Sequence, residues 1–345
     1  MRSSKNTGYA VLRAASPLIG VLLGLFFGAV LILIAGKNPL EAYRQMFLGA
    51  FGGQRQITET LLKTCPYLLI GLGLSTAFRA RIWNIGAEGQ YYMGALFGGI
   101  VGLYCYQALP KWLLLTCMVL AAMLGGALWA LIPALFKLKK GMNEIISTLM
   151  LNYIATLLMQ YLVRGPLREP GSALPRSAKF NALAKMPTLF GTRIHLGVLI
   201  AVLLVPIIYL LLWNTPLGFK LRAAGYSTSV AKYAGYSAAG AVIFSMVFSG
   251  ALAGMAGVIE ATMSYKRLTN VISNNYGFNG VLVALLGRMN PFGVLIASFL
   301  FAALCIGAET IHVVIGLPVA LADVIQALIV LSVLVVDAAV HRKEA

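Results

Sequence analysis

Apolar stretches separated by short polar segments run along the whole chain of 345 residues. Most of the stretches are about 20 residues long, which is the length that an α-helix needs to cross the hydrocarbon core of a bilayer. The pattern therefore predicts an all-α, polytopic membrane helix bundle of about ten spans. The expected spans are residues 17–35, 61–78, 85–104, 112–136, 145–163, 196–213, 239–261, 281–286, 292–308 and 318–336.

Two longer polar segments interrupt this pattern. Residues 164–194 hold four prolines and six Lys or Arg, and we expect an external loop there. Residues 214–238 are expected on the cytoplasmic side. Neither segment is long enough for a soluble domain, so residues 1–345 are interpreted as one transmembrane domain. An even number of spans and the basic clusters at 137–140 and 341–343 favour cytoplasmic termini in a cell (inner or plasma) membrane.

Composition supports the membrane interpretation. The chain is 60% hydrophobic and 11% charged, whereas soluble domains carry about 25% charged residues. The net charge is +17, but the basic residues lie in short clusters between apolar runs. Contact with anionic lipid headgroups explains such clusters better than nucleic-acid binding does. The four cysteines lack metal-ligand spacing, and no metal site is expected.

The chain lacks the loop that binds ATP in phosphate-loop proteins. No G-x-x-x-x-G-K-[ST] sequence is present, so any ATP and Mg²⁺ are expected in a partner subunit and no cofactor in this chain. No catalytic constellation is evident, and the chain is not expected to be an enzyme. Acidic residues within the spans are few, which disfavours an ion-coupled secondary transporter. A structural or assembly membrane protein is a third, weaker alternative.

The cytoplasmic segment 215–237 is basic and has an apolar side. Its charged residues are Lys220, Arg222 and Lys232, and Gly225-Tyr226-Ser227 is expected to separate two short helices. One interpretation is an interfacial helix that lies on lipid. The other is a protruding element that docks into a partner protein.

A polar run opens the expected span at 85–104. Asn84, Glu88 and Gln90 lie in the run 83–90, within the membrane boundary. Non-helical backbone at that depth must face protein or a water-filled cavity. The run therefore predicts an interrupted helix, in which these side chains either contact a neutral polar solute or cap a helix. For Glu88, an ion pair with Arg79 or Arg81 is the favoured alternative.

The cytoplasmic segment carries a family resemblance. Residues 218–225 read G-F-K-L-R-A-A-G, and Ala231, Ala234 and Gly235 precede the small-residue run 249–257. This order resembles the cytoplasmic loop of permeases in the branched-chain amino acid, simple sugar and nucleoside importer superfamily, where the loop contacts the ATPase subunit. The resemblance implies ATPase-coupling roles for Gly218, Phe219, Leu221, Arg222, Gly225, Ala231 and Gly235.

A second motif narrows the family. Residues 78–90 read F-R-A-R-I-W-N-I-G-A-E-G-Q and resemble the signature F-R-A-G-x-x-N-I-G-A-E-G-Q of nucleoside-type permeases, with Arg81 where glycine is common. Similar matches occur at 141–144 (G-M-N-E) and 277–280 (G-F-N-G). We expect the substrate pathway to include Asn84, Glu88, Gln90, Asn143, Glu144, Phe278 and Asn279.

The resemblance implies the permease subunit of an ATP-binding-cassette importer. Its expected cargo is a nucleoside, with a simple sugar as the alternative. Its expected partners are a second homologous permease, a cytoplasmic ATP-binding subunit and an external solute-binding lipoprotein.

An inverted repeat is a further hypothesis. The second to fifth spans and the seventh to tenth spans each hold four helices that start from opposite sides of the membrane, as inverted repeats require. In this alignment Asn84 and Asn279 occupy matching places.

Overall fold

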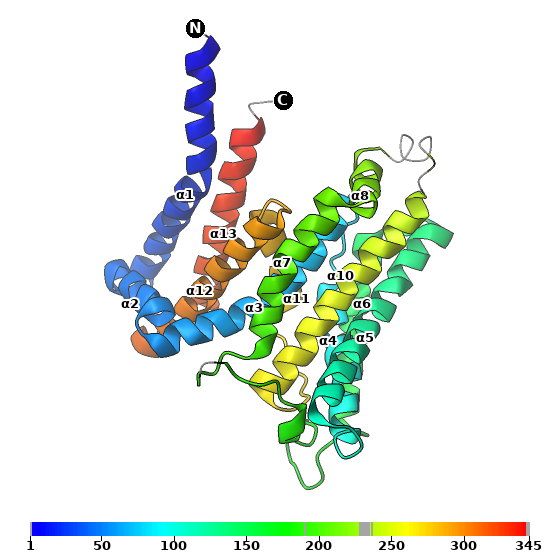
Figure 1. Ribbon diagram of the computed structural model, residues 1–345. Helices are drawn as coiled ribbons and strands as arrows, with labels where there is room; N and C mark the ends of the chain where they lie inside the picture. The colour runs from blue at the N-terminus through cyan, green and yellow to red at the C-terminus, as the bar shows by residue number, and fades with distance from the viewer. Residues whose placement is uncertain (1, 190, 228–234, 236, 343–345) are drawn as a thin grey trace. The chain divides into compact units, whose positions relative to one another are not determined.

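The computed structural model describes residues 2–189, 191–227, 235 and 237–342. Over these residues regular structure is helical, apart from two isolated β-bridges, which confirms the all-α class (Figure 1). The helices are α1 (Arg2–Ile34), α2 (Pro39–Phe51), α3 (Gln54–Arg79), α4 (Ala87–Tyr104), α5 (Lys111–Lys140), α6 (Glu144–Arg164), η1 (Ala182–Ala184), α7 (Leu196–Asn214), α8 (Pro216–Tyr226), α10 (Ala238–Glu260), η2 (Ala261–Tyr265), α11 (Tyr276–Leu286), α12 (Pro291–Ile315) and α13 (Val319–Arg342).

Each expected span lies within a helix, apart from at most two residues at an end, but two of these helices differ from ordinary membrane spans. Among the described residues, seven helices are long and apolar enough to cross a membrane, and eight if α1 from Leu18 and α2, bent by 118°, form one span. The other two are α4, whose first turn carries Glu88 and Gln90, and α11, which has only 11 residues. Since crossing takes about 20 residues, α11 is too short to span alone.

Apolar side chains point outwards on the long helices. Phe26 of α1, Leu157 of α6 and Ile296 of α12 are each more than 60% exposed. So much apolar surface is rare on a soluble monomer. The surface of these helices therefore suits hydrocarbon.

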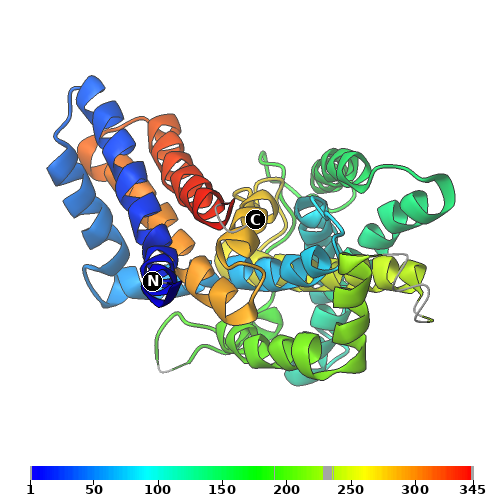
Figure 2. The same cartoon turned by 90° about the horizontal axis from the view of Figure 1, so that it is seen from above.

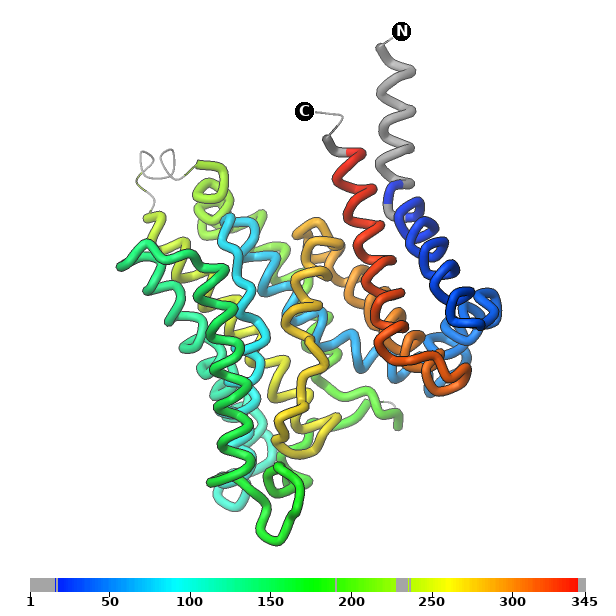
Figure 3. Tube along the Cα trace, turned by 180° about the vertical axis from the view of Figure 1, so that it is seen from behind, coloured from blue at the N-terminus to red at the C-terminus, as the bar shows by residue number. Residues whose placement is uncertain are grey.

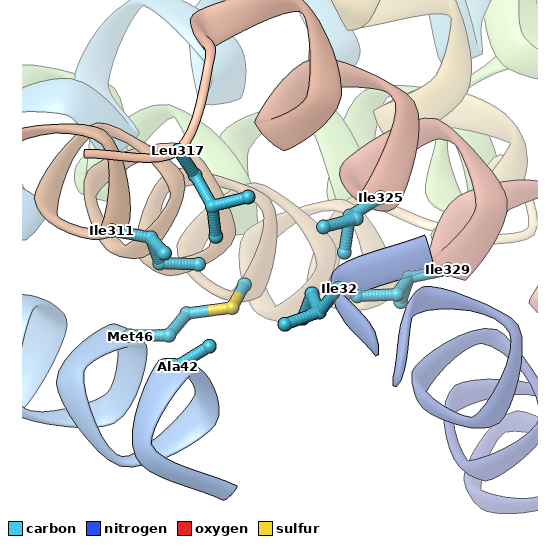
Figure 4. Close-up of a cluster of buried hydrophobic side chains, with 7 residues drawn as sticks. All are labelled: Ile32, Ala42, Met46, Ile311, Leu317, Ile325 and Ile329. Atoms are coloured by element: carbon cyan, nitrogen blue, oxygen red, sulfur yellow. The ribbon is translucent and has the colours of Figure 1, made fainter. Parts of the chain in front are cut away.

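The chain forms two compact units, Met1–Leu61 with Phe299–Ala345, and Leu62–Ser298. In the first unit α1 packs along α13 and against α2 (Figure 2). Side chains from α1, α2, α12, α13 and the turn before α13 form its buried centre (Figure 4). The members are Ile32, Ala42, Met46, Ile311, Leu317, Ile325 and Ile329.

The second unit is built around α4, α5 and α10, which pack against one another in all three pairs. Small residues let the helix backbones approach closely. A Cβ on Gly254 of α10 would lie 2.2 Å from the Ala122 carbonyl oxygen of α5, and one on Gly94 of α4 would lie 2.0 Å from the Gly254 Cα. The small-residue run 249–257 is thus a packing surface for two neighbouring helices.

The segment between α6 and α7 folds onto the segment that follows η2. Glu169 pairs with Arg176 at 3.0 Å and with Arg267 at 2.9 Å, and Ser177 N donates to the Leu268 carbonyl. This segment and α8 lie at opposite ends of the second unit's helices (Figures 1 and 3). The two are therefore placed to face opposite sides of a membrane.

Candidate functional site

The helix α3 ends in a turn whose geometry favours glycine. Arg81 N donates to the Phe78 carbonyl at 2.9 Å and Ile82 N donates to the Ala77 carbonyl at 3.0 Å, which is the Schellman pattern. The residue at the left-handed position of this pattern is Arg81, with φ +54°. Glycine suits that position because it has no Cβ, which explains why the related motif commonly has glycine there.

Asn84 is the centre of a buried hydrogen-bonded cluster after this turn. Its Oδ1 accepts from Gly86 N and from Gln90 Nε2, both at 2.9 Å. Its Nδ2 donates to Gln90 Oε1 at 3.0 Å and to Ser249 Oγ at 3.1 Å. Asn84 has no exposed surface, so a solute reaches its amide only if these bonds break.

Two further side chains hold the non-helical backbone between α3 and α4. Asn152 of α6 donates to the Ile85 carbonyl and accepts from Gly89 N, both at 2.8 Å. Glu144 accepts from the backbone of Trp83 and pairs with Lys137 at 2.6 Å. The irregular backbone at this depth is therefore satisfied by protein groups, as a bilayer requires.

The Glu88 carboxylate caps the neighbouring helix α11. Its Oε2 accepts from Gly277 N at 2.7 Å, in the first turn of that helix. Negative charge is favoured there by the helix dipole. The ion pair expected with Arg79 or Arg81 is not formed, because Glu88 is turned to α11, whereas Arg79 donates to the Met289 carbonyl at 3.3 Å.

The remaining predicted pathway residues are more accessible. Asn143 is exposed and caps α6 by accepting from Ile145 N at 2.8 Å. Phe278 and Asn279 lie half-buried in the first turn of α11. Asn84 precedes its helix, whereas Asn279 lies inside one, so the two asparagines differ in their local structure.

The predicted coupling segment packs directly on the end of α3. Thr215 caps α8 by accepting from Gly218 N at 3.1 Å, and Leu221 and Gly225 are buried. A Cβ on Gly225 would lie 2.2 Å from the Arg79 carbonyl oxygen. The backbone of α8 therefore touches the backbone that leads into the Asn84 cluster.

The expected end of this helix is confirmed, because α8 stops at Tyr226. Phe219 is exposed and Arg222 is half-buried. Gly235 has φ +78°. Ala231, and with it the expected second short helix, lies outside the described residues.

A pocket of about 890 Å³ opens between α8 and the end of α3. The Arg79 guanidinium lies 4.9 Å from the centre of the Trp213 ring, and the Arg222 guanidinium lies 5.9 Å from it. Both distances suit a cation above an aromatic face. The lining residues are Phe78, Arg79, Arg81, Trp83, Trp213, Phe219, Arg222, Ala223, Gly225, Tyr226 and Met289.

Comparison with protein families shows which family the chain belongs to. The family described as the permease component of branched-chain amino acid transport systems matches residues 56–334. The chain belongs to this permease family. The match includes the Asn84 cluster, α8 and α11, so every described candidate residue of the permease lies within it.

Three relatives match most of the length of the permease. It is 36% identical to the glucose ABC transporter permease protein TsgB13 of Haloferax volcanii, over 95% of this chain and 88% of that protein. It is 33% identical to the guanosine ABC transporter permease protein NupP of Bacillus subtilis, over 92% of each chain. It is 31% identical to the nucleoside ABC transporter permease protein NupB of Lactococcus lactis, over 85% of this chain and 83% of that protein.

Three residues of the site were not among the predicted ones. Asn152 and Ser249 complete the Asn84 cluster, and Trp213 supports the two arginines of the pocket. Asn152 stands alone as a polar residue amid apolar neighbours, which is a signal for a buried role. In the sequence Ser249 looks like an ordinary packing residue. Its hydrogen bond with Asn84 is evident only from the structure.

Proposed function

We propose that this permease forms the translocation pathway of an ATP-driven importer for nucleosides. Two of the three relatives named above are nucleoside or guanosine permeases. The structural observation that carries the coupling is the backbone contact between Gly225 of α8 and Arg79 at the end of α3. A push on α8 reaches α3 through this contact, since neither backbone can approach further.

The hydrogen-bonded segment after α3 would carry this movement into the membrane. Asn84 and Gln90 tie the segment to α4 and, through Ser249, to α10, and Glu88 ties α4 to α11. In this proposal Asn84, Glu88 and Gln90 set the shape of the pathway. Phe278 and Asn279, half-exposed at the start of α11, contact the solute. The turn at Asn143 and Glu144 supports the segment from the side.

The proposed complex contains a second homologous permease, a cytoplasmic subunit that binds ATP and Mg²⁺, and an external solute-binding lipoprotein. The α8 end of the second unit faces the ATPase subunit in the cytoplasm. The segment between α6 and α7 then faces outwards, and both termini are cytoplasmic.

A simple sugar is the second candidate cargo. The Haloferax volcanii relative is a glucose permease and has 36% identity. A nucleoside and a sugar both present hydroxyl groups that an amide such as Asn279 binds well. Only the nucleoside carries a base. An uptake experiment in which the two compounds compete therefore identifies the cargo.

The experiment is uptake in proteoliposomes that contain the permease with its partner subunits. Radiolabelled guanosine should enter only with ATP and Mg²⁺ at the ATPase, and excess unlabelled nucleoside should compete whereas glucose should not. Glucose uptake with no competition by nucleosides would establish the second candidate. Uptake that continues without ATP and collapses with an ionophore would contradict an ATP-driven importer.

Asn279→Ala tests the solute contact. Loss of one polar contact should raise the KM for uptake about tenfold, with a normal yield of folded protein. Asn214→Ala is the matched control, since Asn214 is exposed at the end of α7. Equal KM values for the two variants would remove Asn279 from the pathway.

A further inference from the structure

We propose that the pocket beside α8 binds a ligand through a phosphate group, and that the bound phosphate joins α8 to the end of α3. The cargo of the importer plays no part in this site. The pocket is suited to such a ligand by its charge, its aromatic wall and the backbone of Arg81.

The pocket concentrates positive charge without acidic side chains. Arg79, Arg81 and Arg222 line it, and among the described residues its lining includes no Asp or Glu. Two of these guanidiniums lie over the same indole ring, that of Trp213. Like charges beside one ring repel each other, and an anion that contacts both guanidiniums would offset that repulsion.

A phosphate suits this charge better than a carboxylate does. Guanidinium groups bind phosphate oxygens with paired hydrogen bonds, and a phosphate has enough oxygens for several arginines at once. The arginines belong to different elements, with Arg79 at the end of α3, Arg81 in the turn that follows and Arg222 on α8. A phosphate between them therefore bridges the two elements at the place where their backbones touch.

The walls of the pocket can contact the part of the ligand beyond its phosphate. Five aromatic side chains of the described residues line it, and its volume of about 890 Å³ lies in the range of small-molecule sites. An aromatic base or the apolar part of a lipid fits such walls. The aromatic side chains are Phe78, Trp83, Trp213, Phe219 and Tyr226.

The backbone of Arg81 supports a role for its charge in this pocket. Its φ of +54° is in the region that glycine adopts freely and other residues adopt with strain. A strained non-glycine residue next to a pocket is typical of functional sites. At this position the chain has a strained residue with a positive charge, where glycine would have neither the strain nor the charge.

Two sources supply such a phosphate, an anionic phospholipid at the membrane surface and a soluble nucleotide. The test measures both with the purified full-length permease in nanodiscs. Retained phosphatidylglycerol is measured by native mass spectrometry, with phosphatidylcholine as the zwitterionic comparison. Binding of guanosine monophosphate is measured by thermophoresis, with guanosine as the comparison without phosphate, so a wrong cargo assignment leaves the result unaffected.

Arg81→Gly is the decisive variant because it removes the charge and relaxes the backbone. It should weaken binding of the phosphate-bearing probe by at least about tenfold, with a melting temperature no lower than that of the wild type. Lys139→Gln is the matched control, since Lys139 is exposed at the end of α5 and outside the pocket. It should change binding by less than about twofold.

Binding of phosphatidylglycerol alone identifies the lipid as the source, and binding of the nucleotide alone identifies the soluble source. If neither probe binds better than its comparison, or if Arg81→Gly and Lys139→Gln weaken binding equally, the proposal is wrong. Failure of both probes together with weaker ATPase assembly in Arg81→Gly would assign the arginines to an acidic protein surface instead.

Discussion

The segment between α3 and α4 meets two different environments within a few residues. At Asn84 every polar group of the side chain has a protein partner and no surface is exposed. At Arg79 and Arg81 the neighbouring pocket is open and cationic, and no acidic side chain lines it within the part of the chain that the structure describes. Satisfied polar groups in a membrane hold a fold together, whereas uncompensated charge invites a ligand or a partner. The Asn84 cluster is therefore a rigid support, whereas the arginine pocket is a surface that can bind a ligand or a partner.

Asn84→Ala tests the rigid support and should have the largest effect. It removes the partners of Gly86 N, Gln90 and Ser249 at once. We expect the free energy of unfolding to fall by about 2–4 kcal/mol, because buried polar groups would be left unpaired. Unfolding in detergent, followed by circular dichroism, measures this change.

The matched control for this test is Asn143→Ala. Asn143 is an exposed helix cap, and its loss should lower the free energy of unfolding by about 1 kcal/mol. Equal losses for the two asparagines would mean that the Asn84 cluster is not the support described here.

His195 provides the contrasting case of a buried polar group without a partner. Within the described part of the chain its Nδ1 has no hydrogen bond, and burial lowers the pKa of His195 from 6.5 to about 4. The unfolded chain therefore takes up a proton at a higher pH than the folded chain does. The free energy of unfolding should fall by up to about 3 kcal/mol as the pH drops from about 6.5 to 4, and then level off.

His195→Gln should flatten this pH dependence of thermal unfolding, because it removes the titrating group. His312→Gln is the control, since Nδ1 of His312 lies 2.6 Å from the Leu317 carbonyl oxygen. An unchanged pH profile in His195→Gln would show that another group titrates.

Arg81→Gly should have the smallest effect on stability, and in the opposite direction. Relief of the left-handed backbone should raise the free energy of unfolding by about 1 kcal/mol. Thermal unfolding of the purified permease measures it. A destabilised variant would mean that the arginine side chain holds the turn, which would weaken the contrast between the two environments.

Much of the fold follows from the sequence because apolar runs of membrane length have few alternatives. The ten expected spans lie within helices, apart from at most two residues at an end. Residues 83–86 of the polar run are non-helical, whereas residues 87–90 form the first turn of α4. The partner of Glu88 was not predictable, since Gly277 lies 189 residues further along the chain and its free N–H exists only because α11 begins there. The nearby arginines were the obvious partners by charge, but they belong to the other environment.

The contact between α8 and α3 had a partial signal in the sequence. The motif containing Gly225 indicates a coupling segment. The contact of Gly225 with the Arg79 carbonyl, however, depends on the packing of α7, α8 and α3. A glycine in a helix indicates that another backbone packs closely there, but the sequence does not identify which one. The pocket is likewise a product of this packing.

In the proposed mechanism, α8 passes movement to the end of α3 through the contact at Gly225. The most direct test is the ratio of guanosine taken up to ATP hydrolysed in proteoliposomes with Gly225→Val, compared with Gly240→Ala, where an added Cβ meets its nearest atoms only at 3.5 Å. We expect Gly225→Val to assemble and hydrolyse ATP but to lose most of its uptake, so that the ratio falls about tenfold or more. A ratio equal to that of Gly240→Ala, with both variants folded and assembled, would contradict this mechanism.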